Sequence, residues 1–289
     1  MSQLGDVPVG GPNPVRIMGV INISPESFFK KSVKTRKKEI TETVETMEEQ
    51  GADFIDIGGM STAPYLTTVV PEKVEADRIT KAVKIVQGTS NLPISVDTCR
   101  AKVAKTALEL GVDIINDISG LKHDDQMSRI VEKYSPSLVL CAFSKKLVKG
   151  NQLIQTKKLL QESVEIAKSA NVPKEKISLD PAIGFFRKSG RGKFFTKINS
   201  DWLERDLVIL QKLEFLKFGF PLMISVSNKS FIGRLLNLEN PHDRLYGSLA
   251  AEVISVYNGA DIIRTHNVKE TREAITVAKK LSNHIRKGL

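Results

Sequence analysis

Polar side chains stand at the ends of seven of the eight short apolar runs in this chain. They are Asn22, Asp56, Asp97, Asn116, Asp180, Ser227 with Lys229, and Arg264 with His266. A carboxylate accepts two hydrogen bonds from an amidine-like edge, an amide donates and accepts, and an ammonium donates to a ring carbonyl. Together these groups could bind a flat heterocycle that has amino and carbonyl edges. The last pair, Arg264 and His266, suits an anion such as phosphate.

A purely structural role is the alternative for any single polar residue at such a place. Residues of this kind often cap the helix that follows a strand, and Thr98 and Asp117 fit that role. Seven strand ends that converge on one mouth are harder to explain by capping. Burying Asp, Asn and Lys there costs free energy unless a partner satisfies them, so we expect a ligand site.

The elements that would bring these residues together are eight apolar runs that alternate with amphipathic stretches. The runs cover residues 16–22, 54–58, 94–97, 114–117, 138–142, 177–180, 222–225 and 262–264. Continuous apolar runs are typical of parallel strands buried on both faces. The stretches 37–50, 101–110 and 159–170 have helical spacing. This alternation predicts an α/β fold, a (β/α)8 TIM barrel, with its site at the carboxyl ends of the strands.

The length of the chain fits one such barrel. It has 289 residues, of which 41% are hydrophobic, and a barrel of this kind commonly has about 250 residues. We expect the Gly- and Pro-rich residues 1–14 to form a flexible tail and residues 15–289 to form the barrel domain. The basic stretch 185–200 is the longest irregular segment, and long barrel loops often carry function.

Composition argues against several classes of protein. No apolar stretch approaches the roughly 20 residues of a membrane span, and residues 1–14 do not resemble a signal peptide. Cys99 and Cys141 form no CxxC pair, which indicates a reducing compartment. We therefore expect a cytoplasmic protein without a membrane partner. The net charge of +10 is dispersed and only 6% of the residues are aromatic, so nucleic-acid binding is not expected.

Seven sequence blocks, in order, resemble those of dihydropteroate synthases and related pterin-binding proteins. They are IMGVINISPESF (17–28), GADFIDIGGMST (51–62), PISVDT (93–98), INDISG (115–120), SLDPAIGF (178–185), SNKSFIG (227–233) and GADIIRTHNV (259–268). Each block is weak by itself. Seven in the same order, from about residue 16 to the C-terminus, are specific for the fold and for the pterin pocket.

The resemblance implies a transferase of folate biosynthesis. Such an enzyme joins 6-hydroxymethyl-7,8-dihydropterin diphosphate to p-aminobenzoate and releases diphosphate, with Mg2+ as cofactor. The residues that match positions holding the pterin ring are Asp97, Asn116, Asp180 and Lys229. Those that match positions holding the diphosphate and its metal are Asn22, Arg264 and His266, with Asn22 as the metal residue. Thr62 and Ser227 match positions near the diphosphate and p-aminobenzoate.

The implied chemistry suits these residue types. Breaking the bond between the pterin methylene carbon and diphosphate develops positive charge on the pterin and negative charge on the leaving group. Asp180 would stabilise the pterin, while Arg264, His266 and Mg2+ would stabilise the diphosphate. The residues expected to act in catalysis are Asp97, Asp180, Lys229 and Arg264. The amine of p-aminobenzoate is the nucleophile, so no protein nucleophile is needed.

The chain departs from the family pattern in the loops that would bind diphosphate and p-aminobenzoate. Lys30 stands where the first loop usually has an acidic residue that helps the metal, and Lys31 follows it. Ala63 stands where the second loop usually has an arginine, Asn228 replaces another arginine, and Ala182 replaces a glycine. We expect the two lysines to neutralise part of the diphosphate charge and to weaken the dependence on Mg2+.

Two other functions fit a pterin pocket with changed loops. One is the methyltetrahydrofolate-binding barrel of a corrinoid-linked methyltransferase, which would not explain Arg264 and His266. The other is a non-catalytic pterin-binding protein. A homodimer through the last helices would suit the fold of the family.

Overall fold

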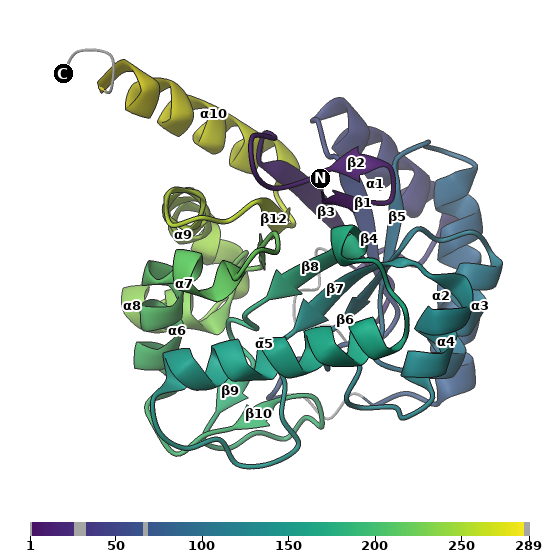
Figure 1. Cartoon of the computed structure of the whole chain (residues 1–289). Coiled ribbons are helices and arrows are strands. Elements are labelled where there is room, and N and C mark those ends of the chain that lie inside the picture. The colour runs from purple at the N-terminus through teal and green to yellow at the C-terminus, as the bar shows by residue number, and fades with distance from the viewer. Residues whose placement is uncertain (1, 26–32, 66–68, 286–289) are drawn as a thin grey trace.

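Eight parallel strands form the centre of the computed structural model, which describes residues 2–25, 33–65 and 69–285 (Figure 1). They are β3 (Arg16–Asn22), β4 (Phe54–Gly58), β5 (Ile94–Asp97), β6 (Ile114–Asp117), β7 (Ser137–Cys141), β8 (Ile177–Asp180), β11 (Met223–Ile224) and β12 (Ile262–Thr265). The order in the sheet is β11-β12-β3-β4-β5-β6-β7-β8. A parallel bridge between Leu179 and Leu222 joins the two outer strands. The predicted eight-stranded barrel is therefore confirmed.

Helices surround the barrel (Figure 1). They are α1 (Lys37–Glu49), α2 (Glu72–Gln87), α3 (Ala101–Glu109), α4 (Met127–Tyr134), α5 (Gln152–Ser169), α6 (Trp202–Gln211), α7 (Leu213–Lys217), α8 (Ser230–Leu236), α9 (Leu245–Tyr257) and α10 (Val268–Ile285). Helix α1 buries Ile40, Val44 and Met47, the face that the periodicity predicts. Helix α5 begins earlier than predicted because the Asn151 side chain accepts hydrogen bonds from the first-turn N–H groups.

A short hairpin closes the amino-terminal end of the barrel. Strands β1 (Gln3–Leu4) and β2 (Val7–Pro8) pair antiparallel. Leu4 is fully buried and packs in a cluster with residues from the barrel interior, including Met18 and Phe54. The structure here differs from the expected flexible tail, because the apolar side chains of residues 2–9 fill this end of the barrel. The polar strand ends therefore face the opposite opening.

The basic stretch after β8 folds onto the carboxyl end of the barrel. Within it, β9 (Phe186–Arg187) and β10 (Thr196–Lys197) form a short parallel pair, at the lower edge of Figure 1. The backbone N–H groups of Arg191 and Gly192 both donate to the carbonyl oxygen of Pro64, so this stretch contacts the loop that follows β4. No helix within the described ranges is long and apolar enough to cross a membrane.

Candidate active site

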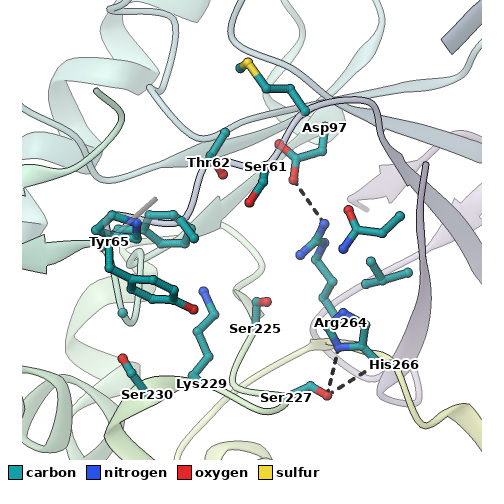
Figure 2. A pocket seen from close by; sticks show the side chains of 17 residues that line it. Ser61, Thr62, Tyr65, Asp97, Ser225, Ser227, Lys229, Ser230, Arg264 and His266 are labelled. Atoms are coloured by element: carbon teal, nitrogen blue, oxygen red, sulfur yellow. Dashed lines mark hydrogen bonds and ion pairs between the residues drawn. The ribbon is translucent and has the colours of Figure 1, made fainter. Parts of the chain in front are cut away.

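A pocket opens at the carboxyl ends of the barrel strands (Figure 2). Seven of the nine residues predicted to bind substrate line it: Asn22, Thr62, Asp97, Ser227, Lys229, Arg264 and His266. The other two, Asn116 and Asp180, are buried, with 4% and 6% of their surface exposed. Asn116 lies at the end of β6 next to Asp97 on β5, and Asp180 ends β8. Residues far apart in the chain thus meet at one mouth, as predicted.

Arg264 is the centre of a buried ion-pair network. Its Nε lies 2.7 Å from Oδ2 of Asp56, and its Nη2 lies 3.1 Å from Oδ2 of Asp97. Asp56 also accepts a hydrogen bond of 2.5 Å from the Ser95 hydroxyl. Although burial opposes it, the two carboxylates raise the pKa of Arg264 above its usual value. The positive charge of the guanidinium is therefore already balanced by Asp56 and Asp97. The sequence predicts an arginine that binds an anion, but it does not predict these two partners.

Asp97 faces the pocket with an unusual protonation equilibrium. Burial raises its pKa to about 7, the Arg264 charge opposes this shift, and Asp56 adds to it. The carboxyl therefore exchanges its proton near neutral pH. Asp56 stands at a strand position that the sequence singled out, but its role as the buried partner of Arg264 was missed, because the two residues are 208 positions apart in the chain.

Lys229 and Asp180 form a second pair of interacting charges at the site. The Lys229 ammonium donates to the carbonyl oxygen of Ile183 at 2.9 Å and lies 4.1 Å from the centre of the Phe185 ring. Burial lowers the pKa of Lys229 to about 8, against the attraction of Asp180. Burial likewise raises the pKa of Asp180, and Lys229 opposes that shift. Figure 2 shows Lys229 extending into the pocket, where its charge is available to a ligand.

His266 is a neutral polar group in this site. Its Nδ1 lies 3.1 Å from the Ser227 hydroxyl, which also accepts from the His266 backbone N–H. Burial, followed by the charges of Arg264 and Lys229, lowers the pKa of His266 to about 3. The imidazole can donate or accept a hydrogen bond at neutral pH but adds no positive charge. A neutral hydrogen-bonding role for His266 therefore fits this environment better than a cationic one.

The far end of the pocket contains residues that the sequence did not single out. Tyr65 and Ser230 line it (Figure 2), and Phe185 is also among the lining residues of the pocket. Burial raises the pKa of Tyr65 to about 12, so its hydroxyl keeps its proton. Arg187 donates to the Ser230 hydroxyl at 2.7 Å. Only the position of Ser230 directly after Lys229 could have indicated its place. Tyr65 reaches the pocket through a loop of irregular sequence, and Arg187, in β9, lies behind the pocket.

Neither cysteine resembles a nucleophile. Cys99 and Cys141 are free and buried, and burial raises the pKa of both thiols well above the usual value. In the described part of the chain, no group of three or more His, Cys, Asp or Glu side chains is arranged to bind a metal ion. Lys30 and Lys31, which were expected near the diphosphate, lie outside the described residues.

Comparison with known proteins assigns this site to a family. The model of the pterin binding enzyme family matches residues 18–266. A dihydropteroate synthase of Clostridium beijerinckii is 35% identical over 260 residues, which cover 89% of this chain and 91% of that protein. The dihydropteroate synthase of Bacillus subtilis is 34% identical over 273 residues, covering 94% of this chain and 89% of that protein.

Solved structures agree with the sequence matches. A dihydropteroate synthase of Coxiella burnetii in complex with pteroic acid has a TM-score of 0.80 and 35% identity, and the match covers 92% of this chain and 93% of that one. The Yersinia pestis enzyme in a sulfonamide complex has a TM-score of 0.84 and 27% identity, covering 98% and 100%. This chain therefore belongs to the dihydropteroate synthase family of pterin binding enzymes.

Proposed function

We propose that this chain joins 6-hydroxymethyl-7,8-dihydropterin diphosphate to p-aminobenzoate and releases diphosphate. The observation that carries the proposal is the buried polar wall at the carboxyl ends of the barrel strands, in a chain that matches dihydropteroate synthases over most of its length. These relatives favour the synthase over the methyltransferase barrel and over a non-catalytic binding protein.

Asp180, Asn116, Asp97 and Lys229 would hold the pterin ring. Two carboxyl groups and an amide match amino and ring N–H donors, and the Lys229 ammonium can donate to the ring carbonyl. All four side chains come from rigid strand ends or, for Lys229, from the residue before α8. Because the ring would replace water in a low-dielectric site, each well-placed hydrogen bond discriminates strongly against other heterocycles.

The reaction exchanges one bond at the pterin methylene carbon for another. The carbon–oxygen bond to diphosphate breaks and its electron pair leaves with the diphosphate, while the amine nitrogen forms the new carbon–nitrogen bond and then loses a proton. The group formed by Arg264, Asp56 and Asp97 carries a net negative charge when both carboxyls are ionised. This negative charge stabilises the positive charge that develops on the pterin.

The diphosphate would lie at the rim near Asn22, Ser227 and His266. These are neutral hydrogen-bond donors or acceptors, so they orient the anion and supply little charge. Thr62 and Ser227 would separate the diphosphate from p-aminobenzoate, whose ring would lie toward Phe185 and Tyr65. Net positive charge of the chain would draw both anionic substrates to the mouth.

Mg2+ fits this site only in part. Among the described residues proposed here as ligands, Asn22 offers one neutral oxygen, and the neighbouring carboxylate of Asp97 is paired with Arg264. Mg2+ usually binds through carboxylates and substrate phosphates. The protein groups alone do not form a complete metal site, and the steps proposed here use none. A magnesium ion would enter as the partner of the diphosphate.

We also propose a homodimer through the last helices and a cytoplasmic location. Support for the dimer comes from large apolar side chains that are exposed on the outer faces of α9 and α10: Tyr246, Ile254, Tyr257, Val277 and Leu281. Such a face favours association with a second apolar surface.

Support for the cytoplasmic location comes from the two free, buried cysteines.

A mass-spectrometric assay of the product tests the proposed function. Purified protein with the pterin diphosphate, p-aminobenzoate and Mg2+ should form dihydropteroate. Asp180→Asn should weaken binding of a pterin analogue by about 1–3 kcal/mol, because buried donors lose their charged acceptor. Asp261→Asn is the matched control: its carboxylate is also buried and accepts a backbone N–H, from Leu222, but at the opposite end of the barrel. Unchanged pterin affinity in a folded Asp180→Asn protein would remove Asp180 from the site.

A further inference from the structure

We propose that Arg187, Arg205 and Asp206, which lie behind the pocket, are positioning residues for its pterin wall. We call these three residues the α6 charge cluster. They do not line the pocket. They fix the backbone that follows Asp180 and contribute to the charge that Lys229 experiences. The proposal rests on the proposed function for the identity of the ligand, but the contacts that carry it are independent of that function.

Asp206 is the centre of the cluster. It lies in α6 and is fully buried. Its Oδ1 pairs with Arg205 at 2.9 Å, and its Oδ2 lies 3.6 Å from the Arg187 guanidinium. The same Oδ2 accepts the backbone N–H of Gly184 at 3.0 Å. One carboxylate therefore binds two cations and one peptide group of the segment after β8.

Arg205 fixes the preceding peptides of that segment. Its Nη2 donates to the carbonyl oxygen of Pro181 at 2.6 Å, and its Nη1 donates to that of Ala182 at 3.3 Å. The guanidinium also stacks on the Phe186 ring at 3.7 Å. The carbonyl of Ile183, next in sequence, is bound by Lys229. Successive peptide groups after Asp180 are thus each held by a charged side chain.

The backbone held in this way has two residues with positive φ, of which Ala182 is strained because it carries a Cβ. Ala182 has φ +58° and Gly184 has φ +86°, the left-handed region that a residue with a Cβ rarely adopts. A Cβ on Gly184 would stand 2.9 Å from Cδ of Lys229, so this turn and the Lys229 side chain are packed against one another. Displacement of the turn would therefore move Lys229 and the groups around Asp180 together.

Arg187 extends the cluster to α8. It donates to the Ser230 hydroxyl, directly after Lys229, and stacks on Trp202, the first residue of α6. Buried ion pairs often stabilise a fold no better than apolar side chains of similar size would. What this cluster supplies is a defined geometry on both sides of Lys229.

The charge of Asp206 in the cluster also affects the pKa of Lys229. Apart from burial, the groups that act on the Lys229 ammonium are Asp180 of β8, Arg264 of β12, Asp206 of α6 and Cys141 of β7. Asp180 and Asp206 raise its pKa and Arg264 lowers it. Removal of the Asp206 charge should therefore make Lys229 lose its proton at lower pH, an effect that a merely structural residue would not have.

The first experiment follows the titration of Lys229 by NMR in the ligand-free protein. The Lys229 signal is assigned by its loss in Lys229→Met. Asp206→Asn keeps an acceptor for the Gly184 N–H but removes the charge, so the midpoint should fall below that of the wild-type protein. Asp261→Asn, the buried control at the opposite end of the barrel, should leave it unchanged. An identical midpoint in Asp206→Asn and wild type would overturn the electrostatic part of the proposal.

The second experiment separates geometry from charge. Arg205→Lys keeps the positive charge but lacks the planar fork that reaches Pro181 and Ala182. It should weaken binding of 6-hydroxymethylpterin by roughly 10-fold or more, since a small misplacement at a site is costly. Unchanged affinity in folded Arg205→Lys would overturn the positioning role, even if Asp206→Asn fails to fold. If the wild type forms no dihydropteroate, the proposed function fails, while the ligand-free titration still decides the electrostatic link.

Discussion

At the scale of single residues, the site is a set of buried charges that depend on one another. Arg264 between Asp56 and Asp97 is the clearest case, because each charge is tolerated only in the presence of the others. The sequence predicts that these charged residues stand at the ends of strands. It does not predict which of them pair, because the pairing depends on distances between strands that are remote in the chain.

Loss of Arg264 should be more damaging than loss of His266. Arg264→Ala leaves the buried carboxylate of Asp56 and the half-buried carboxylate of Asp97 without their partner, and it should cost about 3–5 kcal/mol of unfolding free energy. His266→Ala removes a neutral group and should cost about 1 kcal/mol. Urea unfolding measures both values. Diphosphate affinity by calorimetry should fall more for Arg264→Ala, because Asp56 and Asp97 are then unpaired negative charges that repel the anion. Adding Asp56→Asn to Arg264→Ala should recover part of the stability; equal diphosphate affinity in wild type and Arg264→Ala would contradict the site.

The pH dependence of kcat/KM should be a narrow bell. Asp97 must be ionised to balance the pterin charge, so the rate should rise as pH increases through about 7. Lys229 must keep its proton to donate, so the rate should fall as pH increases through about 8. In Lys229→Arg the alkaline limb should move to higher pH, because a guanidinium does not titrate there. A flat profile between about pH 6 and about pH 9 would rule out these roles.

At the scale of elements, the strands were predictable because each is a continuous apolar run between polar or turn residues. The amino-terminal hairpin was not recognised. Its strands β1 and β2 have two residues each, which is too short for an alternating pattern to stand out. The one available signal was Gly5-Asp6 between Leu4 and Val7, a pair suited to a tight turn, and Gly5 does have φ +56°.

The hairpin should contribute to stability and leave the site unaffected. Leu4 is fully buried among interior barrel residues, so Leu4→Ala should cost about 2–5 kcal/mol of unfolding free energy through the cavity it leaves. Gln3→Ala changes an exposed neighbour and should stay within about 0.5 kcal/mol of wild type. Thermal or urea unfolding distinguishes the two. A Leu4→Ala protein as stable as Gln3→Ala would show that the hairpin is not part of the core.

The loop after β8 has a structural feature that the sequence pattern does not predict. Its basic composition is evident in the sequence, and its function stays a prediction. That Arg187 is buried between Asp206, Ser230 and Trp202 follows only once α6 and α8 are packed side by side. A charge run in sequence gave no sign that one of its arginines is internal.

At the scale of the whole molecule, one end of the barrel is apolar and closed and the other is polar and open. This division follows from the alternation of strands and helices, which places all strand carboxyl ends at one mouth. The polar residues recognised in the sequence therefore had to meet, and most of them line one pocket. The opposite end carries Leu4 and its neighbours, where the sequence had suggested only a tail.

The formation of dihydropteroate across a Mg2+ series tests the proposed function most directly. The protein and the Bacillus subtilis relative are each supplied with the pterin diphosphate and p-aminobenzoate, with Mg2+ varied and then removed by a chelator, and the product is followed by mass spectrometry. We expect product from both proteins, with a shallower Mg2+ dependence here, because Lys30 and Lys31 stand in the first loop and Asn22 is the one proposed protein ligand. Absence of product at every Mg2+ concentration, from protein that binds pterin, would contradict the synthase assignment.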